Sequence, residues 1–360
     1  MPSHEDGADG MSKSGAGNFF EDFSLGQEIV HATPRTVTEG DVSLYTALTG
    51  SRFAVQSADT FAMDIGYPAA PVDDLLVFHI VFGKTVPDIS LNAVANLGYA
   101  DCRFLAPVFP GDTLTATSEV IGLRETSNRK AGVVWVRSTG ANQTGETVLE
   151  YARWVMVSKR DVDAPASEPH VPELTERVAP DRLAQGLPPL DTGAFSTALA
   201  GSPDRWGDYE AGEKIDHVDG MTIEGAEHQI ATRLYQNTAR VHFNAHAMKD
   251  SRFERRLIYG GHIISLARAL SFNGLANAFH VAAINAGTHV APCFAGDTVY
   301  AWSEIVEREE VPGRADVGAL RVRTIAVKGH ACADFPFKSD DDSYEGGVLL
   351  DIDYWVLLPR

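Results

Sequence analysis

The chain has 360 residues, of which 44% are hydrophobic and 22% charged, and its formal net charge is −19. This length is enough for two domains with sizeable cores. The composition is that of a soluble globular protein, because no apolar run approaches the roughly 20 residues of a membrane span. The negative charge and the scattering of lysine and arginine argue against nucleic-acid binding, since a phosphate backbone would be repelled.

Neither the cysteines nor the N-terminal residues indicate a chemical role. The three cysteines are widely separated and form no CxxC motif, which argues against a disulfide framework and a thiolate metal site. Residues 1–18 are polar and rich in glycine and serine, without the apolar segment of a secretory signal. We therefore expect a disordered leader, a cytoplasmic location and no membrane attachment.

Residues 19–161 are expected to form the first domain. Residues 27–38 alternate like a strand, and Thr38 or Asp41 is placed to cap the helix that follows. Residues 72–86 are apolar on all sides, which is typical of a helix buried in a core, and His79 within it is expected to be a hydrogen-bonded core residue. Four strands are then predicted at residues 93–106, 112–123, 132–139 and 148–158.

The second half of the chain repeats the first. The segment APVFPGDT from Ala106 returns as APCFAGDT from Ala291, at a constant offset of 185 residues. Such self-similarity indicates that a whole domain was duplicated. Residues 162–216, interrupted by prolines, are expected to form a linker, and residues 217–360 the second domain. Its elements are predicted as a helix at 260–274 and strands at 281–290, 298–306, 320–327 and 347–358.

Each half is thus expected to be an α+β unit of one long helix and an antiparallel sheet. Two such copies are expected to pack edge to edge in one continuous sheet, because pairing removes exposed strand edges.

The best candidates for chemistry are Asn237 and His242, with Gly260 and Gly261 eighteen residues further on. Imidazole titrates near neutral pH, so His242 is suited to acid/base work. A helix that begins at Gly260 offers free N–H groups to an oxyanion or a phosphate, although the glycines are equally explained by close helix packing. His242 and His246 have the spacing of zinc ligands, but Phe243 stands where a HExxH motif has glutamate, so zinc is not expected.

Positive charges close to these residues are candidates for substrate binding. A cluster precedes the glycine helix and is placed to neutralise the phosphates of a cofactor or substrate, although each member alone is more simply a solvated surface residue. The candidates for substrate binding are Arg240, Arg252, Arg255, Arg256 and, through its backbone, Gly261.

These features together resemble a known family. The duplicated unit, His242, the polar residue five positions before it and the glycine helix start are similar to MaoC-like, (R)-specific enoyl-CoA hydratases with a double hotdog fold. The segments GNFFEDFSLGQ, TEGDVSLYTALTGSRFAVQS and LEYARWVMVSKRD resemble the mesaconyl-CoA hydratase (β-methylmalyl-CoA dehydratase) branch of that family more closely. The likeness covers nearly the whole chain outside the leader.

The resemblance implies a fold and a reaction. Each hotdog domain would be a long central helix wrapped by an antiparallel sheet, and the enzyme would be a hydro-lyase that adds water to a branched dicarboxylic acyl-CoA thioester by syn addition. Carried over by position, His242 matches the catalytic histidine, Asn237 the catalytic aspartate and Gly260 the oxyanion donor. In the first repeat Ser51 and Gln56 replace the catalytic pair, so that copy is expected to be inert.

Asn237 departs from the family pattern. An amide takes no proton, so His242 would carry proton transfer while Asn237 orients the water. An aspartate there would repel the free carboxylate of a dicarboxylic substrate, which gives a physical reason for asparagine.

Other readings stay open from the sequence: a hydratase for another acyl chain, a hotdog thioesterase that attacks the thioester carbonyl, or a non-catalytic acyl-CoA binding protein. We expect an acyl-CoA partner, no metal or redox cofactor, and a homo-oligomer.

Overall fold

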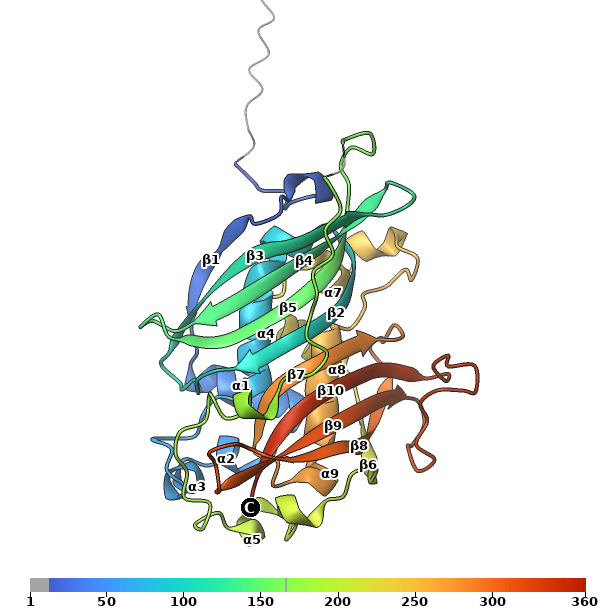
Figure 1. Ribbon diagram of the computed structural model, residues 1–360. Helices are drawn as coiled ribbons and strands as arrows, with labels where there is room; N and C mark the ends of the chain where they lie inside the picture. The colour runs from blue at the N-terminus through green and yellow to red at the C-terminus, as the bar shows by residue number, and fades with distance from the viewer. Residues whose placement is uncertain (1–12, 166) are drawn as a thin grey trace, which may run out of the picture.

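The computed structural model describes residues 13–165 and 167–360. The predicted disordered leader falls largely on residues 1–12, which lie outside the described residues. Ten strands form one antiparallel sheet in the order β1-β3-β4-β5-β2-β7-β10-β9-β8-β6. The sheet curls around two long helices, α4 and α8, which lie side by side behind it in Figure 1. No helix among the described residues is long and apolar enough to cross a membrane.

The first half contains the first five strands and the helices that accompany them. The strands are β1 (Glu28–Thr36), β2 (Ala93–Phe104), β3 (Thr113–Glu125), β4 (Ala131–Ala141) and β5 (Thr147–Ser158). The helices are η1 (Phe20–Asp22), α1 (Glu39–Thr49), α2 (Ala54–Ser57), α3 (Asp59–Asp64), α4 (Asp74–Thr85) and the π-helical turn η2 (Val86–Ser90). The predicted cap at Thr38 is confirmed, since its side chain accepts a hydrogen bond from Asp41 N and Asp41 caps in return.

The second half repeats this order. Its strands are β6 (Lys214–Thr222), β7 (His280–His289), β8 (Thr298–Glu310), β9 (Val317–Lys328) and β10 (Val348–Pro359). Its helices are α6 (Gly225–Leu234), α7 (Arg240–Phe243), η5 (Ala247–Asp250), α8 (Gly260–Leu270) and α9 (Phe272–Leu275). The predicted start of the glycine helix at Gly260 is confirmed.

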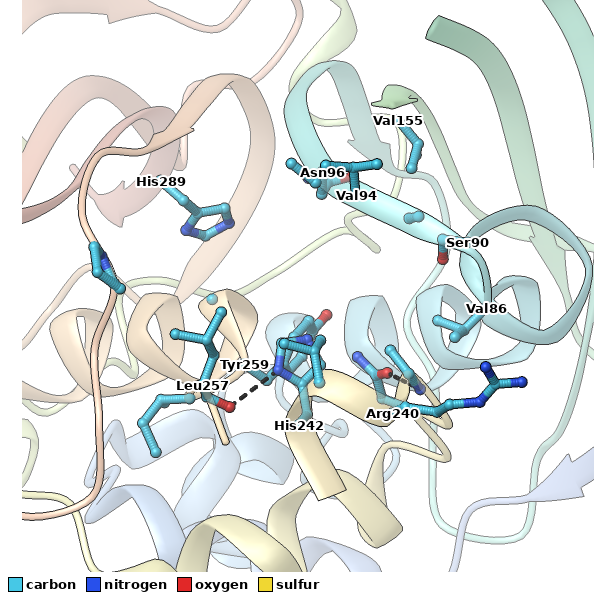
Figure 2. Close-up of a pocket in the computed structure, with 18 of the residues that line it drawn as sticks. Val86, Ser90, Val94, Asn96, Val155, Arg240, His242, Leu257, Tyr259 and His289 are labelled. Carbon is cyan, nitrogen blue, oxygen red and sulfur yellow. Dashed lines mark hydrogen bonds between the residues drawn. The ribbon is translucent and has the colours of Figure 1, made fainter. Parts of the chain in front are cut away.

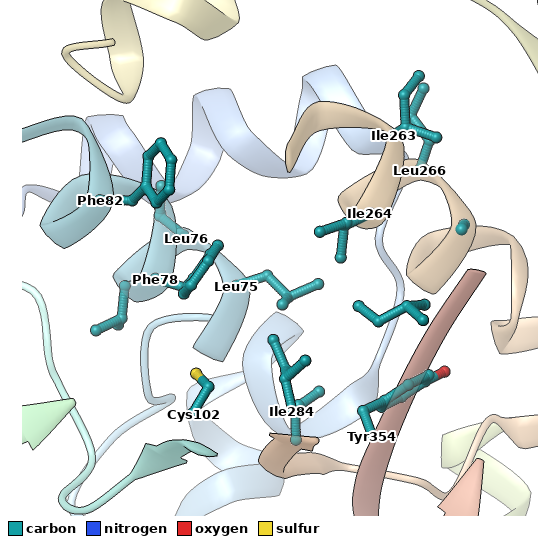
Figure 3. Packing of buried hydrophobic residues seen from close by; sticks show 14 of the residues in the cluster. Leu75, Leu76, Phe78, Phe82, Cys102, Ile263, Ile264, Leu266, Ile284 and Tyr354 are labelled. Atoms are coloured by element: carbon teal, nitrogen blue, oxygen red, sulfur yellow. The ribbon is translucent and has the colours of Figure 1, made fainter. Parts of the chain in front are cut away.

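The two half-sheets meet where β2 pairs with β7, with Tyr99 opposite Gly287 and Arg103 opposite Ala283. The predicted edge-to-edge pairing of the two copies is therefore confirmed. Both central helices face the inside of this shared sheet, and their apolar side chains meet those of the strands in one core, as Figure 3 shows for Leu75, Ile264 and Ile284. The cavity described below lies between the two halves, where their sheets meet.

Helix α4 is buried on all faces from Leu75 onwards, as its mostly apolar sequence predicts. His79 is confirmed as a satisfied core residue, because its Nε2 lies 2.7 Å from Ser265 Oγ on α8 and so links the two central helices. Gly83 allows the chain that follows α6 to cross α4 closely. A Cβ atom at Gly83 would lie 1.8 Å from the carbonyl oxygen of Tyr235, so a larger residue would force these two segments apart.

The segment between the halves has little regular structure, as predicted: η3 (Pro180–Arg182), α5 (Thr197–Ala200) and η4 (Trp206–Asp208) are all short. Strand β6 begins at Lys214, inside the predicted linker. The segment is more than a connection, because buried Leu183 and Phe195 belong to a hydrophobic cluster with Trp355 of β10. It therefore contributes to the core of the second half.

Candidate active site

A cavity of about 460 Å³, a size typical of small-molecule sites, lies between the two halves. The first half supplies residues of α4, η2, β2 and β5, and the second half supplies the chain from Asn237 to Ile263 together with the end of β7. Figure 2 shows His242, Tyr259 and His289 facing Asn96 and Val155 across this space. The described lining residues include two cations, Arg153 and Arg240, and no aspartate or glutamate. In an acidic chain, this lining favours an anionic ligand.

His242 is placed by a tight turn after α6. Gln236 has φ 54°, in the left-handed region, and Asn237 follows it with its side chain buried. Asn237 Oδ1 accepts a hydrogen bond of 3.1 Å from Ala239 N, which starts the single turn of helix α7 that carries His242. The imidazole then packs edge-on against Tyr259, with the ring centroids 5.5 Å apart.

One contact determines which ring nitrogen of His242 carries the proton, and burial keeps the ring neutral. Its Nδ1 lies 3.1 Å from the carbonyl oxygen of Leu257, drawn as the dashed line in Figure 2. A carbonyl only accepts, so Nδ1 carries the proton and Nε2 keeps its lone pair. Burial lowers the pKa of His242 to about 4, partly offset by the bond to Leu257. The side chain is therefore a neutral base at pH 7.

Asn237 lines the same cavity, and its Oδ1 is already used by Ala239. The amide nitrogen Nδ2 is thus the group left to donate to a ligand or water. This geometry suits an orienting role and excludes proton removal by the same side chain.

Gly260 is the first residue of α8, and Tyr259 before it provides no side-chain cap. The first N–H groups of a helix have no partner within it, so they are available to an oxygen in the cavity. The His289 ring covers the Cα of Gly260, since a Cβ atom there would lie 2.4 Å from His289 Cε1. Glycine is therefore required at this position for close packing as well as for access. Gly261 does not line the cavity.

The candidate arginines separate into two groups. Arg240 is exposed and lines the cavity. The others do not line it: Arg252 stacks on Phe253, Arg255 stacks on Phe294 with 3.7 Å to the ring centroid, and Arg256 donates to Gln229. Their proposed contact with CoA phosphates stays a prediction. His246 is exposed, and the described residues contain no group of three or more His, Cys, Asp or Glu placed to hold a metal.

The corresponding helix start in the first half is closed by its own side chains. Asp73 Oδ1 accepts from Leu75 N at 2.9 Å, and Asp74 pairs with His280 and accepts from Val281 N. Gln56 donates to the carbonyl of Phe279 and lies outside the cavity. These contacts support the prediction that this copy is inert.

The cavity residues that the sequence analysis missed include Tyr99, Arg153 and His289. Tyr99 OH lies 3.1 Å from His289 Nε2, so the two act as one polar unit beside Gly260. The sequence does contain a signal for His289, because the equivalent position in the first repeat, 185 residues earlier, is the apolar residue Phe104. Arg153 has one too, because it is a charge in a row of β5 that also contains Leu149, Tyr151, Val155 and Val157.

Comparisons with known sequences agree on one group. The sequence model of the mesaconyl-CoA hydratase family matches residues 6–336. The chain is 63% identical to β-methylmalyl-CoA dehydratase of Chloroflexus aurantiacus, over 97% of this chain and 99% of that one. It is 60% identical to mesaconyl-CoA hydratase of Cereibacter sphaeroides, over 97% of this chain and all of that one.

Solved structures show the same likeness. A MaoC domain dehydratase from Chloroflexus aurantiacus superposes with a TM-score of 0.94 and 62% identity, covering 97% of this chain and 99% of that one. A Mycobacterium tuberculosis protein described as a double hotdog fold has a TM-score of 0.74 and 26% identity, with 96% and 99% coverage. The expected α+β double hotdog architecture is confirmed.

Proposed function

Because this chain belongs to the mesaconyl-CoA hydratase family, we propose that it adds water reversibly to mesaconyl-CoA to give β-methylmalyl-CoA. The observation that carries the proposal is a neutral His242 in the same cavity as the open N-terminus of α8. A base and an oxyanion donor are the two groups that hydration of an enoyl thioester requires.

In this mechanism the thioester carbonyl lies against the N–H of Gly260. His242 Nε2 removes a proton from a water molecule as the water oxygen forms a bond to C3. The C2–C3 double bond shifts its electrons into the thioester, and the N-terminus of α8 stabilises the enolate oxygen. The proton then passes to C2 on the same face, which completes syn addition. Asn237 Nδ2 holds the water by donating to its oxygen.

The family resemblance also leaves a thioesterase as the second candidate, in which water attacks the carbonyl carbon and releases CoA. The two reactions differ in the carbon that the water attacks, C3 or the carbonyl carbon, so their products distinguish them. The homo-oligomeric state and the cytoplasmic location stay predictions.

The function is tested with purified protein and mesaconyl-CoA, following the enoyl-thioester absorbance and free thiol at the same time. We expect the absorbance to fall without thiol release, and to rise again when β-methylmalyl-CoA is the substrate. Thiol release would indicate a thioesterase, and no change in either signal would exclude mesaconyl-CoA as the substrate.

Asn237→Asp tests why an amide stands at this position. Aspartate keeps the oxygen that accepts from Ala239 N, so the turn is preserved, but it brings a negative charge near the substrate carboxylate. Repulsion on the order of 1–2 kcal/mol corresponds to a KM for mesaconyl-CoA about tenfold higher. The KM for crotonyl-CoA, which has no free carboxylate, should change much less. Equal changes for both substrates would show that charge repulsion is not the reason for asparagine.

A further inference from the structure

Arg153 is an unusual residue for the inside of a sheet. It lies on β5 in the row that faces α4, between the buried side chains of Tyr151 and Val155. Its exposed fraction is 0%. Burying a guanidinium is unfavourable unless its donors are satisfied and its charge is compensated.

The donors of Arg153 are only partly satisfied. Nη2 donates to Thr85 Oγ1 at 2.8 Å and to Ser90 Oγ at 3.5 Å, and the guanidinium stacks on Phe82 with 4.2 Å from Cζ to the ring centroid. Nε and Nη1 have no hydrogen-bond partner in the described structure, and no ion pair is formed by this side chain there. The residue therefore carries a positive charge and free donors at the wall of the cavity.

Other buried arginines of the chain do not share this state. Arg103 pairs with Asp101 and with Glu150, the latter at 2.5 Å. Arg268 stacks on Phe53 in the same way as Arg153 stacks on Phe82, but it donates to Ser271 Oγ and to the carbonyl of Ala278. Arg103 Nε also lacks a hydrogen bond, but that side chain forms two ion pairs. Among these three buried arginines, Arg153 alone combines unfilled donors with the absence of an ion pair among the described residues.

At the equivalent strand position, the second half has a residue whose polar group is hydrogen-bonded. Arg153 is the seventh residue of β5, and the seventh residue of β10 is Tyr354, whose hydroxyl lies 2.9 Å from Thr324 Oγ1. The arginine is therefore no general requirement of this strand position. It occurs in the half whose strand faces His242 across the cavity.

Contacts connect the guanidinium to the reacting groups. Phe82, beneath the guanidinium, lies 5.8 Å from the ring of Tyr259, which in turn lies 5.5 Å from His242. The strand partner of Arg153 on β2 is Tyr99, whose hydroxyl contacts His289 above Gly260. Asn96, also on β2 and opposite Val155, lines the same wall, and neither atom of its amide has a partner among the described residues.

We propose that Arg153 binds the distal carboxylate of a dicarboxylic acyl-CoA and so selects this substrate class. The inference rests on the proposed function and extends it. In such a thioester the carboxylate is attached to C3, so holding it also fixes the carbon that receives the water. The carboxylate supplies the missing acceptor and the missing negative charge, and a charge-assisted hydrogen bond in a desolvated site is strong. Asn96 Nδ2 is placed to donate to the same group.

The experiment compares Arg153→Met with Arg268→Met, the matched control, using mesaconyl-CoA and crotonyl-CoA. For Arg153→Met we expect kcat/KM for mesaconyl-CoA to fall on the order of 100-fold, as for loss of one partner of a buried charge pair. The value for crotonyl-CoA should stay within about threefold, since that substrate makes no such contact. Arg268→Met should affect both substrates equally. Equal losses for both substrates in Arg153→Met would overturn the proposal and make Arg153 a packing residue.

Saturated thioesters cannot be hydrated, so their inhibition constants measure binding of the acyl group without any reaction. Succinyl-CoA, with a terminal carboxylate, should bind the unaltered enzyme more tightly than butyryl-CoA, and Arg153→Met should remove the difference. If Arg153→Met does not fold, Arg153→Lys carries the test, with a smaller loss confined to the carboxylated ligands. An unaltered enzyme that fails to hydrate mesaconyl-CoA but prefers succinyl-CoA would refute the proposed reaction and keep the role of Arg153. Equal binding of both thioesters would refute that role alone.

Discussion

His242→Ala is expected to lower kcat for mesaconyl-CoA hydration by about 10²- to 10⁴-fold, the usual range for loss of a positioned general base. The cavity lining includes no described carboxylate to take over proton removal. His289, the other histidine there, is engaged by Tyr99 and covers Gly260. The loss should appear in kcat more than in KM, because proton transfer belongs to the transition state.

The matched control is His246→Ala, which removes an exposed imidazole four residues further along the chain. It should leave both kinetic constants unchanged. If His242→Ala kept more than a tenth of the activity, another group would be the base and the proposed assignment would be wrong.

Acidification is expected to unfold the protein between pH 6.5 and 4 through its buried histidines. His79, His217, His228 and His262 are almost fully buried, and burial lowers their pKa values to about 3, 4, 3 and 4. The unfolded chain, with a histidine pKa near 6.5, takes up protons that the folded chain refuses. The stabilisation is therefore complete above pH 6.5 and is lost as the pH falls towards the folded values.

The size of this effect follows from proton linkage. Burial also lowers the pKa values of the cavity residues His242 and His289 to about 4. Each of the six histidines lowers the free energy of unfolding by about 1.4 kcal/mol for each pH unit of acidification in this window, so together they give on the order of 8 kcal/mol per unit. Urea titrations at pH 7.5, 6.0 and 5.0 measure the slope. His262→Phe should reduce the slope by about one sixth, the share of one among six such histidines, and His246→Ala should leave it unchanged. A midpoint independent of pH over this range would contradict the assignment.

Much of the fold was predictable because the chain contains its architecture twice. The positions of most strands, the buried helix at 72–86 and the start of α8 at Gly260 follow from alternation, apolar periodicity and glycine placement. Strand β6 was not predicted, and the end of β8 and the start of β9 differ by three or four residues from the predicted ones. The pairing of β2 with β7 followed from duplication and from the penalty of exposed edges. The packing of Leu183 and Phe195 against the second half had no such signal, since isolated apolar residues between prolines show no period.

The site was predictable only in its local part. Asn237, His242 and Gly260 lie within one continuous stretch and match a motif. Arg153 and Tyr99 reach the cavity from strands far away in the sequence, so their role depends on sheet order and on which hydrogen bonds remain unmade. Neither the order of the strands in the sheet nor the set of unmade hydrogen bonds can be read from a single sequence.

The two copies that pair through β2 and β7 belong to one chain, so their sequences can differ, whereas the subunits of a dimer of identical chains cannot differ. In such a dimer every change appears twice, so an arginine suited to one acyl pocket would also be placed in the other. Within one polypeptide, β5 contains Arg153 where β10 has Tyr354, and the second half has His242 where the first half has Gln56. In the roles proposed above, one copy contacts the acyl group and the other moves protons. The chain should accordingly bind one acyl-CoA per polypeptide, where a symmetric ancestor with two such units would have bound two.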